Sequence, residues 1–278
     1  MIQKFKNSQI PLYLSIDVQS LASKHEKLCS FINDLQQNQV LIDVIAVQET
    51  WQIINPTTVQ IPGFNLFYKT RAFSRGSGVG FYVKDTISTK IIDNLSTFHE
   101  KIFESITLEI SSNNKKILIS NIYRSPSPNL DSTNSFCEKL ESLLSNLNLM
   151  NSQSILFMDS NINLLNLLTN AGVRNFHDTI TNNGFLQLIL KSSRIQNNSF
   201  SLIDQILTNN NTSNILSGSI INDMSDHFLT FTTFSAHKKE KCQKVIESRN
   251  FSPKNVANFK EALGALTWDS TFQQDNMK

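Results

Sequence analysis

Short apolar runs that end in polar residues recur along this chain, and they restrict the folds open to it. Residues 154–158 form one such run, Ser-Ile-Leu-Phe-Met, and Asp159 and Asn161 stand just beyond its end. A run of this length suits a buried strand, and polar groups at strand ends are where α/β proteins usually meet ligands. The same polar residues also suit a turn or a helix N-cap before residues 162–165, so this stretch alone leaves both interpretations open.

Many other segments have the composition of strands. The strand-like runs lie at residues 10–16, 40–47, 64–68, 78–83, 104–110, 116–122, 201–207, 218–221 and 228–234. Apolar residues between 28 and 35 recur at helical spacing, and a second helix is expected at about residues 132–147. Because strands and helices do not alternate strictly, the pattern predicts mixed or antiparallel sheets with helices packed outside them.

The composition excludes several classes of protein. No apolar run approaches the roughly 20 residues that a membrane-spanning helix needs, and the start of the chain lacks the apolar core and cleavage site of a secretory signal. Cys29, Cys137 and Cys242 include no Cys-x-x-Cys pair, which favours a reducing compartment and argues against a zinc site. Net charge is only +2, so any binding of nucleic acid must depend on local patches. We therefore expect an intracellular protein without a membrane partner.

A change in composition divides the chain near its end. Residues 236–253 are polar and basic and end in proline, and residues 256–270 have the pattern of an amphipathic helix. Residues 1–235 are therefore expected to form one domain, and residues 236–278 a basic linker followed by a helix.

Polar residues of a particular kind gather at the predicted strand ends. They include several carboxylates, a tyrosine, an arginine, an asparagine and a histidine: Asp17, Glu49, Tyr123, Arg124, Asp159, Asn161, Asp204, Asp226 and His227. If these strand ends converge, their side chains suit a hard divalent cation with oxygen ligands, and a histidine and an aspartate for proton transfer.

The same motifs, taken in order, resemble those of the endonuclease/exonuclease/phosphatase superfamily. They are most similar to the apurinic-type endonuclease domain of LINE (non-LTR) retrotransposons. The motifs are LSIDVQSLASK (14–24), VIAVQETW (44–51), RGSGVGFYVKD (75–85), NIYRSPS (121–127), FMDSNINLL (157–165), SLIDQIL (201–207) and SDHF (225–228). Together they span residues 10–235 approximately, and the segment after them is similar to the one that leads toward the reverse transcriptase, which this chain lacks.

This resemblance implies a fold and an activity. The fold is a DNase I-like α/β sandwich of four layers, in which two mixed β-sheets are flanked by helices. The activity is that of a Mg²⁺-dependent DNA endonuclease, with Mn²⁺ as an alternative, which leaves a 3′-hydroxyl and a 5′-phosphate for target-primed reverse transcription. The implied partners are DNA and, in a full-length element, its RNA and reverse transcriptase, with action in the nucleus and no obligate protein partner.

The resemblance also implies a role for each matching residue. Glu49 and Asp226 correspond to metal-binding carboxylates. The catalytic set comprises Asp159, Asn161, His227, Asp204 and Tyr123. Asp204 corresponds to the acid that pairs with the histidine, whereas Asp159 corresponds to the group that orients or deprotonates water or protonates the leaving oxygen. Contacts with phosphate or DNA are implied for Asp17, Arg124, Ser201 and Ser225, and a surface salt bridge is an alternative for Arg124. Glu104 matches a family glutamate to which no role is assigned.

Three departures from the family pattern bear on activity. Asp17 stands where the family usually has asparagine, Gln205 where it has histidine, and Met158-Asp159-Ser160-Asn161 where it has Gly-Asp-Phe-Asn. A carboxylate about 4 Å from another anion costs about 4 kcal/mol at an effective dielectric near 20, roughly a thousandfold in rate. Metal binding or protonation of Asp17 would offset this cost. Two alternatives therefore stay open: a catalytically impaired DNA-binding remnant, and a phosphoesterase of the same fold acting on another phosphoester.

Overall fold

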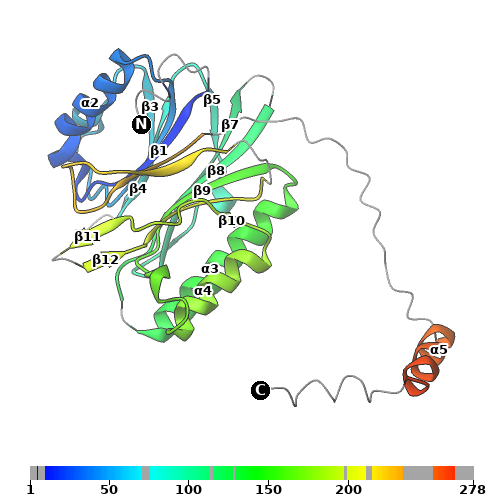
Figure 1. Cartoon of the computed structure of the whole chain (residues 1–278). Helices are drawn as coiled ribbons and strands as arrows, with labels where there is room; N and C mark the ends of the chain where they lie inside the picture. Colours follow the sequence, from blue (N-terminus) through cyan, green and yellow to red (C-terminus); the bar gives the residue numbers. More distant parts are fainter. Residues whose placement is uncertain are drawn as a thin grey trace. The chain divides into compact units, whose positions relative to one another are not determined.

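The computed structural model describes Phe5 and residues 10–70, 76–112, 115–127, 129–196, 199–210, 215–233 and 253–266. It divides the chain into two compact units, Met1–Ala236 and His237–Lys278. In the second unit the described residues form helix α5 (Pro253–Gly264), and the predicted basic linker lies outside the described residues. All the other elements belong to the first unit (Figure 1).

Six strands form the first sheet, in the order β14-β15-β1-β2-β4-β3. Their bounds are β1 (Leu12–Asp17), β2 (Ile42–Gln48), β3 (Phe64–Lys69), β4 (Val79–Lys84), β14 (Ser217–Ile220) and β15 (Leu229–Thr233). Only β1 and β2 run parallel, and helix α2 (Leu21–Gln37) connects them. This strand–helix–strand unit brings the C-terminal ends of β1 and β2 together.

The second sheet has the order β10-β13-β9-β8-β7-β5, with β6 paired to β7. Its strands are β5 (Ser88–Ile91), β6 (Phe98–His99), β7 (Phe103–Ser112), β8 (Lys115–Tyr123), β9 (Gln153–Asp159), β10 (Leu186–Gln187) and β13 (Asp204–Thr208). Here β8 and β9 form the parallel pair, and helix α3 (Leu130–Leu149) connects them. The two sheets therefore each contain one parallel pair of strands joined by a helix. In both sheets, polar residues stand at the C-terminal ends of that pair.

Smaller elements complete the first unit. They are a hairpin of β11 (Arg194–Gln196) and β12 (Ser199–Ser201), helix α4 (Ala171–Asn182), and the short 3₁₀ helices η1 (Pro56–Val59), η2 (Asp93–Leu95) and η3 (Leu164–Asn166). Helices α3 and α4 lie side by side along the second sheet (Figure 1). No helix in the described residues is long and apolar enough to cross a membrane.

Alternation of side chains along the strands builds the four layers. On β1, Leu12, Leu14 and Ile16 face the apolar side of α2, whereas Tyr13 points into the core shared with the second sheet. The rings of Phe81 and Phe157 meet edge to face across that core, with centroids 6.0 Å apart. The predicted fold is confirmed: two mixed β-sheets are packed face to face and flanked by helices.

Candidate active site

Strand register gathers the polar side chains at one end of the two sheets. In the first sheet Asp17 pairs with Gln48. In the second, Asp159 lies between Tyr123 of β8 and Asp204 of β13. Residues that stand opposite one another on neighbouring strands project from the same face of a sheet, so the three side chains from the second sheet share one side of the site.

A histidine and an aspartate form a buried pair in this site. Nδ1 of His227 lies 3.0 Å from both carboxylate oxygens of Asp204, and both residues are buried. Burial by itself lowers the pKa of His227, but the charge of Asp204 and the hydrogen bond to it raise the pKa to about 10, with further support from Asp17 and Asp159. The imidazole is therefore held protonated, in one orientation, near neutral pH.

Asp159 and Asn161 form a tight turn at the end of β9. The backbone N–H of Asn161 donates to Oδ1 of Asp159 over 3.0 Å, and its side-chain amide donates to Oδ2 over 3.1 Å. Burial raises the pKa of Asp159 to about 7, and the charge of Asp204 adds to the rise, although His227 opposes it. The arrangement is an Asx-type turn and a cluster of functional groups at once, so the two interpretations of this stretch are compatible. A carboxyl group that titrates near 7 is suited to proton transfer.

Asp17 is fully buried, and one of its oxygens is unsatisfied. Oδ1 accepts the N–H of Gln19 over 3.1 Å, but Oδ2 has no hydrogen-bond partner in the described part of the chain. Burial raises the pKa of Asp17 well above its ordinary value, and Glu49 and Asp159 add to the rise, while His227 opposes it. The carboxyl group is thus poised for a proton or a cation.

Glu49 is hydrogen-bonded to Tyr123. The tyrosine hydroxyl donates to Oε1 of Glu49 over 2.7 Å, and the indole N–H of Trp51 donates to Oε2 over 3.4 Å. Burial, with the charge of Glu49 next, raises the pKa of Tyr123 far above its ordinary value, so the phenol stays neutral. Tyr123, a member of the implied catalytic set, thus directs its hydroxyl to a carboxylate.

Asp226 is held by an arginine that the sequence did not single out. Its Oδ2 lies 2.6 Å from both Nε and one terminal nitrogen of Arg194, and its Oδ1 accepts the side-chain amide of Gln19 over 2.7 Å. Burial acts to raise the pKa of Asp226, but the hydrogen bond and charge of Arg194 outweigh it and lower the pKa. In this structure the carboxylate predicted to bind metal is already neutralised by protein.

The other three residues with implied contacts to phosphate or DNA, Arg124, Ser225 and Ser201, differ in their burial and in their hydrogen bonds. Arg124 is fully buried, so the alternative of a surface salt bridge is wrong, and its implied contact with phosphate or DNA stays a prediction. Ser225 donates to the carbonyl of Asp17 over 2.7 Å, which fastens the His227 segment to β1. Ser201 contributes its backbone carbonyl to Ser193, and no hydrogen bond of its side chain is found in the described residues.

Three supporting groups were not assigned from the sequence. Ser193 accepts the N–H of Asp204 over 2.9 Å, and its carbonyl accepts the N–H of Phe228, so it braces both sides of the histidine–aspartate pair. Gln48 donates to Asn121 across the two sheets over 2.5 Å. A small polar residue between apolar segments carries little signal in one sequence, which is why these were not found.

Glu104 acquires a structural role. Its Oε2 accepts the N–H of Gly78 over 2.8 Å, and the carbonyl of Gly78 accepts the N–H of Thr50, the residue after Glu49. The backbone of Glu49 itself is left-handed, with φ of 49°, as is that of Asn161, with φ of 48°. Left-handed backbone outside glycine is uncommon and collects at functional sites, where the surrounding structure holds it in place.

One group of side chains has the right chemistry for a metal. Oxygen atoms of Asp17 and Asp159 and a ring nitrogen of His227 all lie within 4.8 Å of one another. Two carboxylates, one with an unsatisfied buried oxygen, match the oxygen ligands that Mg²⁺ and Mn²⁺ prefer. The residues present therefore fit a divalent cation between β1 and β9.

Comparison with known proteins places the fold. No protein-family model matches the sequence, and no curated protein matches it. Among solved structures, an AP endonuclease (LMAP) from Leishmania major has a TM-score of 0.67 and 16% identity, covering 84% of this chain and 90% of that one.

Two further structures carry the same fold. The endonuclease domain of TRAS1, a telomere-specific non-LTR retrotransposon, has a TM-score of 0.59 and 14% identity over 82% of this chain and 100% of that one. TDP2 from D. rerio, complexed with a single-strand DNA product, has a TM-score of 0.58 and 14% identity over the same shares. At such identities the likeness establishes the fold alone, and it agrees with the fold that the sequence motifs predict.

Proposed function

We propose that this chain, built on the fold of endonuclease/exonuclease/phosphatase proteins, is a divalent-metal-dependent endonuclease that nicks DNA. The observation that carries the proposal is the buried cluster of Asp17, Asp159 and His227 at the end of both sheets. It combines paired carboxylates with a protonated imidazole, the groups that a phosphodiester hydrolase needs. The fold is shared with structures titled as an AP endonuclease and a retrotransposon endonuclease domain.

In the proposed reaction, water adds to phosphorus and the bond to the 3′ oxygen breaks, which leaves a 5′-phosphate and a 3′-hydroxyl. Asp159, ionised and oriented by Asn161, takes the proton of the attacking water. His227, kept protonated by Asp204, donates a hydrogen bond to a phosphate oxygen as negative charge develops on it. A water molecule from the solvent gives the 3′ oxygen its proton, and Asp159 releases the proton that it took to the solvent, which completes the balance.

Asp17, whose Oδ2 is unsatisfied, is the residue that would hold Mg²⁺ or Mn²⁺, with Glu49 close by, while Asp159 serves as the base. When bound, the cation neutralises the phosphate charge and polarises phosphorus toward attack. Tyr123 fixes the carboxylate of Glu49, and Trp51 adds a second donor. This set differs from the one that the family resemblance implies, because Arg194 and Gln19 occupy the carboxylate of Asp226.

The element context follows from the motif resemblance. In a retroelement the 3′-hydroxyl would prime reverse transcription in the nucleus, with element RNA and reverse transcriptase as partners. Residues 1–235 would be the nuclease domain, and residues 236–278 the linker and helix toward the polymerase. The likeness to the TRAS1 endonuclease domain supports this placement.

End-group analysis tests the proposed chemistry. Nicked plasmid from a Mg²⁺ reaction is offered directly to a DNA polymerase and, in parallel, to a DNA ligase. The proposal expects extension and religation without pretreatment. Ends that must first be treated with a phosphatase would contradict it, because they would carry a 3′-phosphate.

A second candidate, a DNA-binding remnant that no longer cleaves, is favoured by one observation. Asp17 places a third acidic group where the family has a neutral amide, and its Oδ2 is buried without a partner. Such a remnant would bind DNA without nicking it in Mg²⁺, and Asp17→Asn would restore cleavage. Cleavage by the unaltered chain would exclude this candidate.

A further inference from the structure

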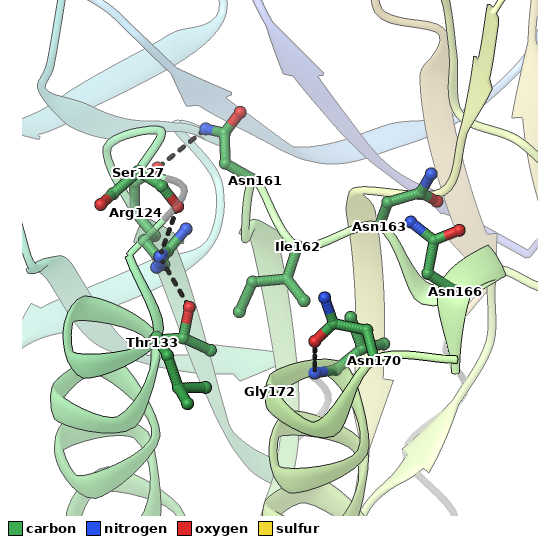
Figure 2. Close-up of a pocket in the computed structure, with 11 residues that line it drawn as sticks. Arg124, Ser127, Thr133, Asn161, Ile162, Asn163, Asn166, Asn170 and Gly172 are labelled. Carbon is green, nitrogen blue, oxygen red and sulfur yellow. Dashed lines mark hydrogen bonds between the residues drawn. The ribbon is translucent and has the colours of Figure 1, made fainter. Parts of the chain in front are cut away.

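A cavity of about 190 Å³ with a wall of polar and apolar residues opens beside the candidate active site (Figure 2). It lies between the N-terminal ends of α3 and α4, and Asn161 forms part of its wall. The side chain of Asn161 donates both to Asp159, over 3.1 Å, and to the carbonyl of Arg124, over 2.8 Å. The cavity and the catalytic cluster therefore share one residue.

The wall of the cavity is rich in hydrogen-bonding groups and contains no acidic side chain. The lining residues with polar side chains are Arg124, Ser127, Thr133, Asn161, Asn163, Asn166 and Asn170. Amides and hydroxyls of this kind donate readily to an anion. No carboxylate lines the cavity, which favours negative charge over positive charge, although the charge of Asp159 acts on Arg124 from the side of the catalytic cluster.

Arg124 is a buried cation without an ionic partner. Its guanidinium lies between Ser127 and Thr133 on one side of the cavity (Figure 2), and it donates to the carbonyl of Ser127 over 3.3 Å and to the hydroxyl of Thr133 over 3.1 Å. Its Nε has no partner, and no Asp or Glu forms an ion pair with it among the described residues. The guanidinium also donates to the carbonyl of Ser160 over 3.4 Å and lies 5.8 Å from the centre of the Phe136 ring, so protein groups surround the charge but leave it without an ion pair.

The start of α4 adds a second positive feature on the opposite side. Asn170 caps the helix by accepting the N–H of Val173 over 3.1 Å, and Gly172 stands in the first turn. That turn has no acidic residue, whereas the first turn of α3 has Asp131. First-turn amides point out of a helix without acceptors of their own and attract anions. Asn170 already accepts the N–H groups of Val173 and Arg174, so the amides of this turn left for an anion are those of Ala171 and Gly172, and Gly172 is buried against Leu130 and Thr133.

We propose that this cavity is a phosphate-binding subsite, which holds a phosphodiester of the substrate strand next to the one that is cleaved. Arg124 and the first turn of α4 supply its positive walls, and Asn166 and Asn163 supply amide donors at its rim. Its assignment to a DNA strand rests on the proposed function. Anion binding itself does not, because it needs neither a metal nor hydrolysis.

Calorimetric titration of the full chain in EDTA tests the subsite, with inorganic phosphate and a four-nucleotide thymidylate as probes. Asn166→Asp places a negative charge at the rim, and the carboxamide it replaces has no side-chain hydrogen bond among the described residues. We expect Asn166→Asp to lower the affinity for both probes by about fivefold or more. Asn33→Asp on the exposed face of α2 is the matched control and should bind as the unaltered chain does.

Arg124→Met separates a binding role from a structural one. If the arginine serves the subsite, this variant loses affinity for both probes and unfolds in phosphate-free buffer at a temperature no lower than the unaltered chain. A sharp fall in unfolding temperature, with phosphate binding unchanged in Asn166→Asp, would overturn the proposal. So would an unaltered chain that binds neither probe.

The two probes also separate the sources of phosphate. If Asn166→Asp weakens inorganic phosphate but leaves thymidylate binding unchanged, the cavity takes a free phosphate and the assignment to DNA is wrong. A chain that binds as expected but never nicks DNA would refute the proposed function and leave the anion site standing. Mg²⁺-dependent nicking by a chain that binds neither probe in this cavity would support the proposed function and refute the anion site.

Discussion

His227 and Asp204 join the two sheets through a buried contact between a histidine and an aspartate. Asp204 begins β13 in the second sheet, and His227 stands just before β15 in the first, yet Nδ1 lies 3.0 Å from both oxygens of the carboxylate. The pair thus fixes the distance between the sheets at the point where the proposed catalytic groups meet. It also holds the imidazole in the orientation that presents its other nitrogen to the cluster.

The charge coupling in this pair predicts how stability depends on pH. Because the pKa of His227 is raised to about 10 in the folded state, its contribution is fully present below about pH 6.5 and is lost as pH rises through 10. Asp204→Asn should therefore cost about 3 kcal/mol at pH 6 and little at pH 10.5. Urea unfolding at the two pH values measures this, and an equal loss at both would contradict the coupling.

An amide substitution at Asp17 should have the opposite effect on stability from the one at Asp204. Burial raises the pKa of this carboxyl group, so the folded state resists ionisation and loses stability as pH rises above the unfolded value near 4. At pH 8 in EDTA, Asp17→Asn should stabilise the chain by about 1–3 kcal/mol. Mg²⁺ should then raise the unfolding temperature of the unaltered chain more than that of the variant.

The Mg²⁺ response separates the two accounts of Asp17. Equal stabilisation of both proteins by Mg²⁺ would show that Asp17 is not a metal ligand. Glu109→Gln, which changes a carboxylate on β7 that is paired with Lys116, serves as the control for a general effect of charge.

Gly78 predicts a steric requirement behind Glu49. A Cβ at this position would lie 2.3 Å from Oγ1 of Thr50, and the backbone has φ of +96°. Gly78→Ala should therefore destabilise the chain by about 3 kcal/mol or more and lower nicking by displacing the Glu49 segment. In Gly184→Ala, with φ of +74° and open space around the new atom, only the backbone cost of about 1 kcal/mol is expected. Denaturant unfolding compares the two, and equal losses would refute the steric account.

The contacts of Arg194 predict a link between the β11–β12 hairpin and His227, for which we propose a catalytic role. It holds Asp226, and it also forms a backbone bridge with His227. Arg194→Met should lower nicking by about tenfold and cost only about 1 kcal/mol of stability, because the ion pair is partly exposed. Hydrogen exchange should quicken in the hairpin.

The control for Arg194 is a similar ion pair far from the site. Lys116→Met breaks the exposed contact of 2.8 Å with Glu109 and should leave nicking unchanged. A nicking rate in Arg194→Met that matches this control would show that the hairpin link has no part in catalysis.

Much of the fold follows from short-range pattern. Apolar runs mark strands such as β1, β9 and β15, which are buried along nearly their whole length, and helical spacing marks the buried faces of α2 and α3, so these elements were predicted within a few residues. The short strands β5, β6 and β10 were not predicted. Helix α4 was not predicted, because Asn, Thr and Gly weaken its helical pattern and only Val173, Phe176 and Ile180 mark its buried face. The β11–β12 hairpin was missed since each strand has only three residues.

The candidate site was predictable in membership but not in pairing. The carboxylates and the histidine could be named because they stand at strand ends in a recognisable order. Their partners depend on contacts between distant segments, such as Arg194 with Asp226 or Tyr123 with Glu49. A single sequence gives no register for these contacts, so the neutralised state of Asp226 and the burial of Arg124 emerged only in three dimensions.

The most direct test of the central claim is nicking of supercoiled plasmid by the purified chain in Mg²⁺ and in EDTA, beside Asp159→Asn. The account predicts open-circular product in Mg²⁺ and none in EDTA. It also predicts a rate lower by about a hundredfold or more in Asp159→Asn, while the surface variant Asp178→Asn cleaves normally. Cleavage that persists in EDTA, or that is unchanged in Asp159→Asn, would contradict the account.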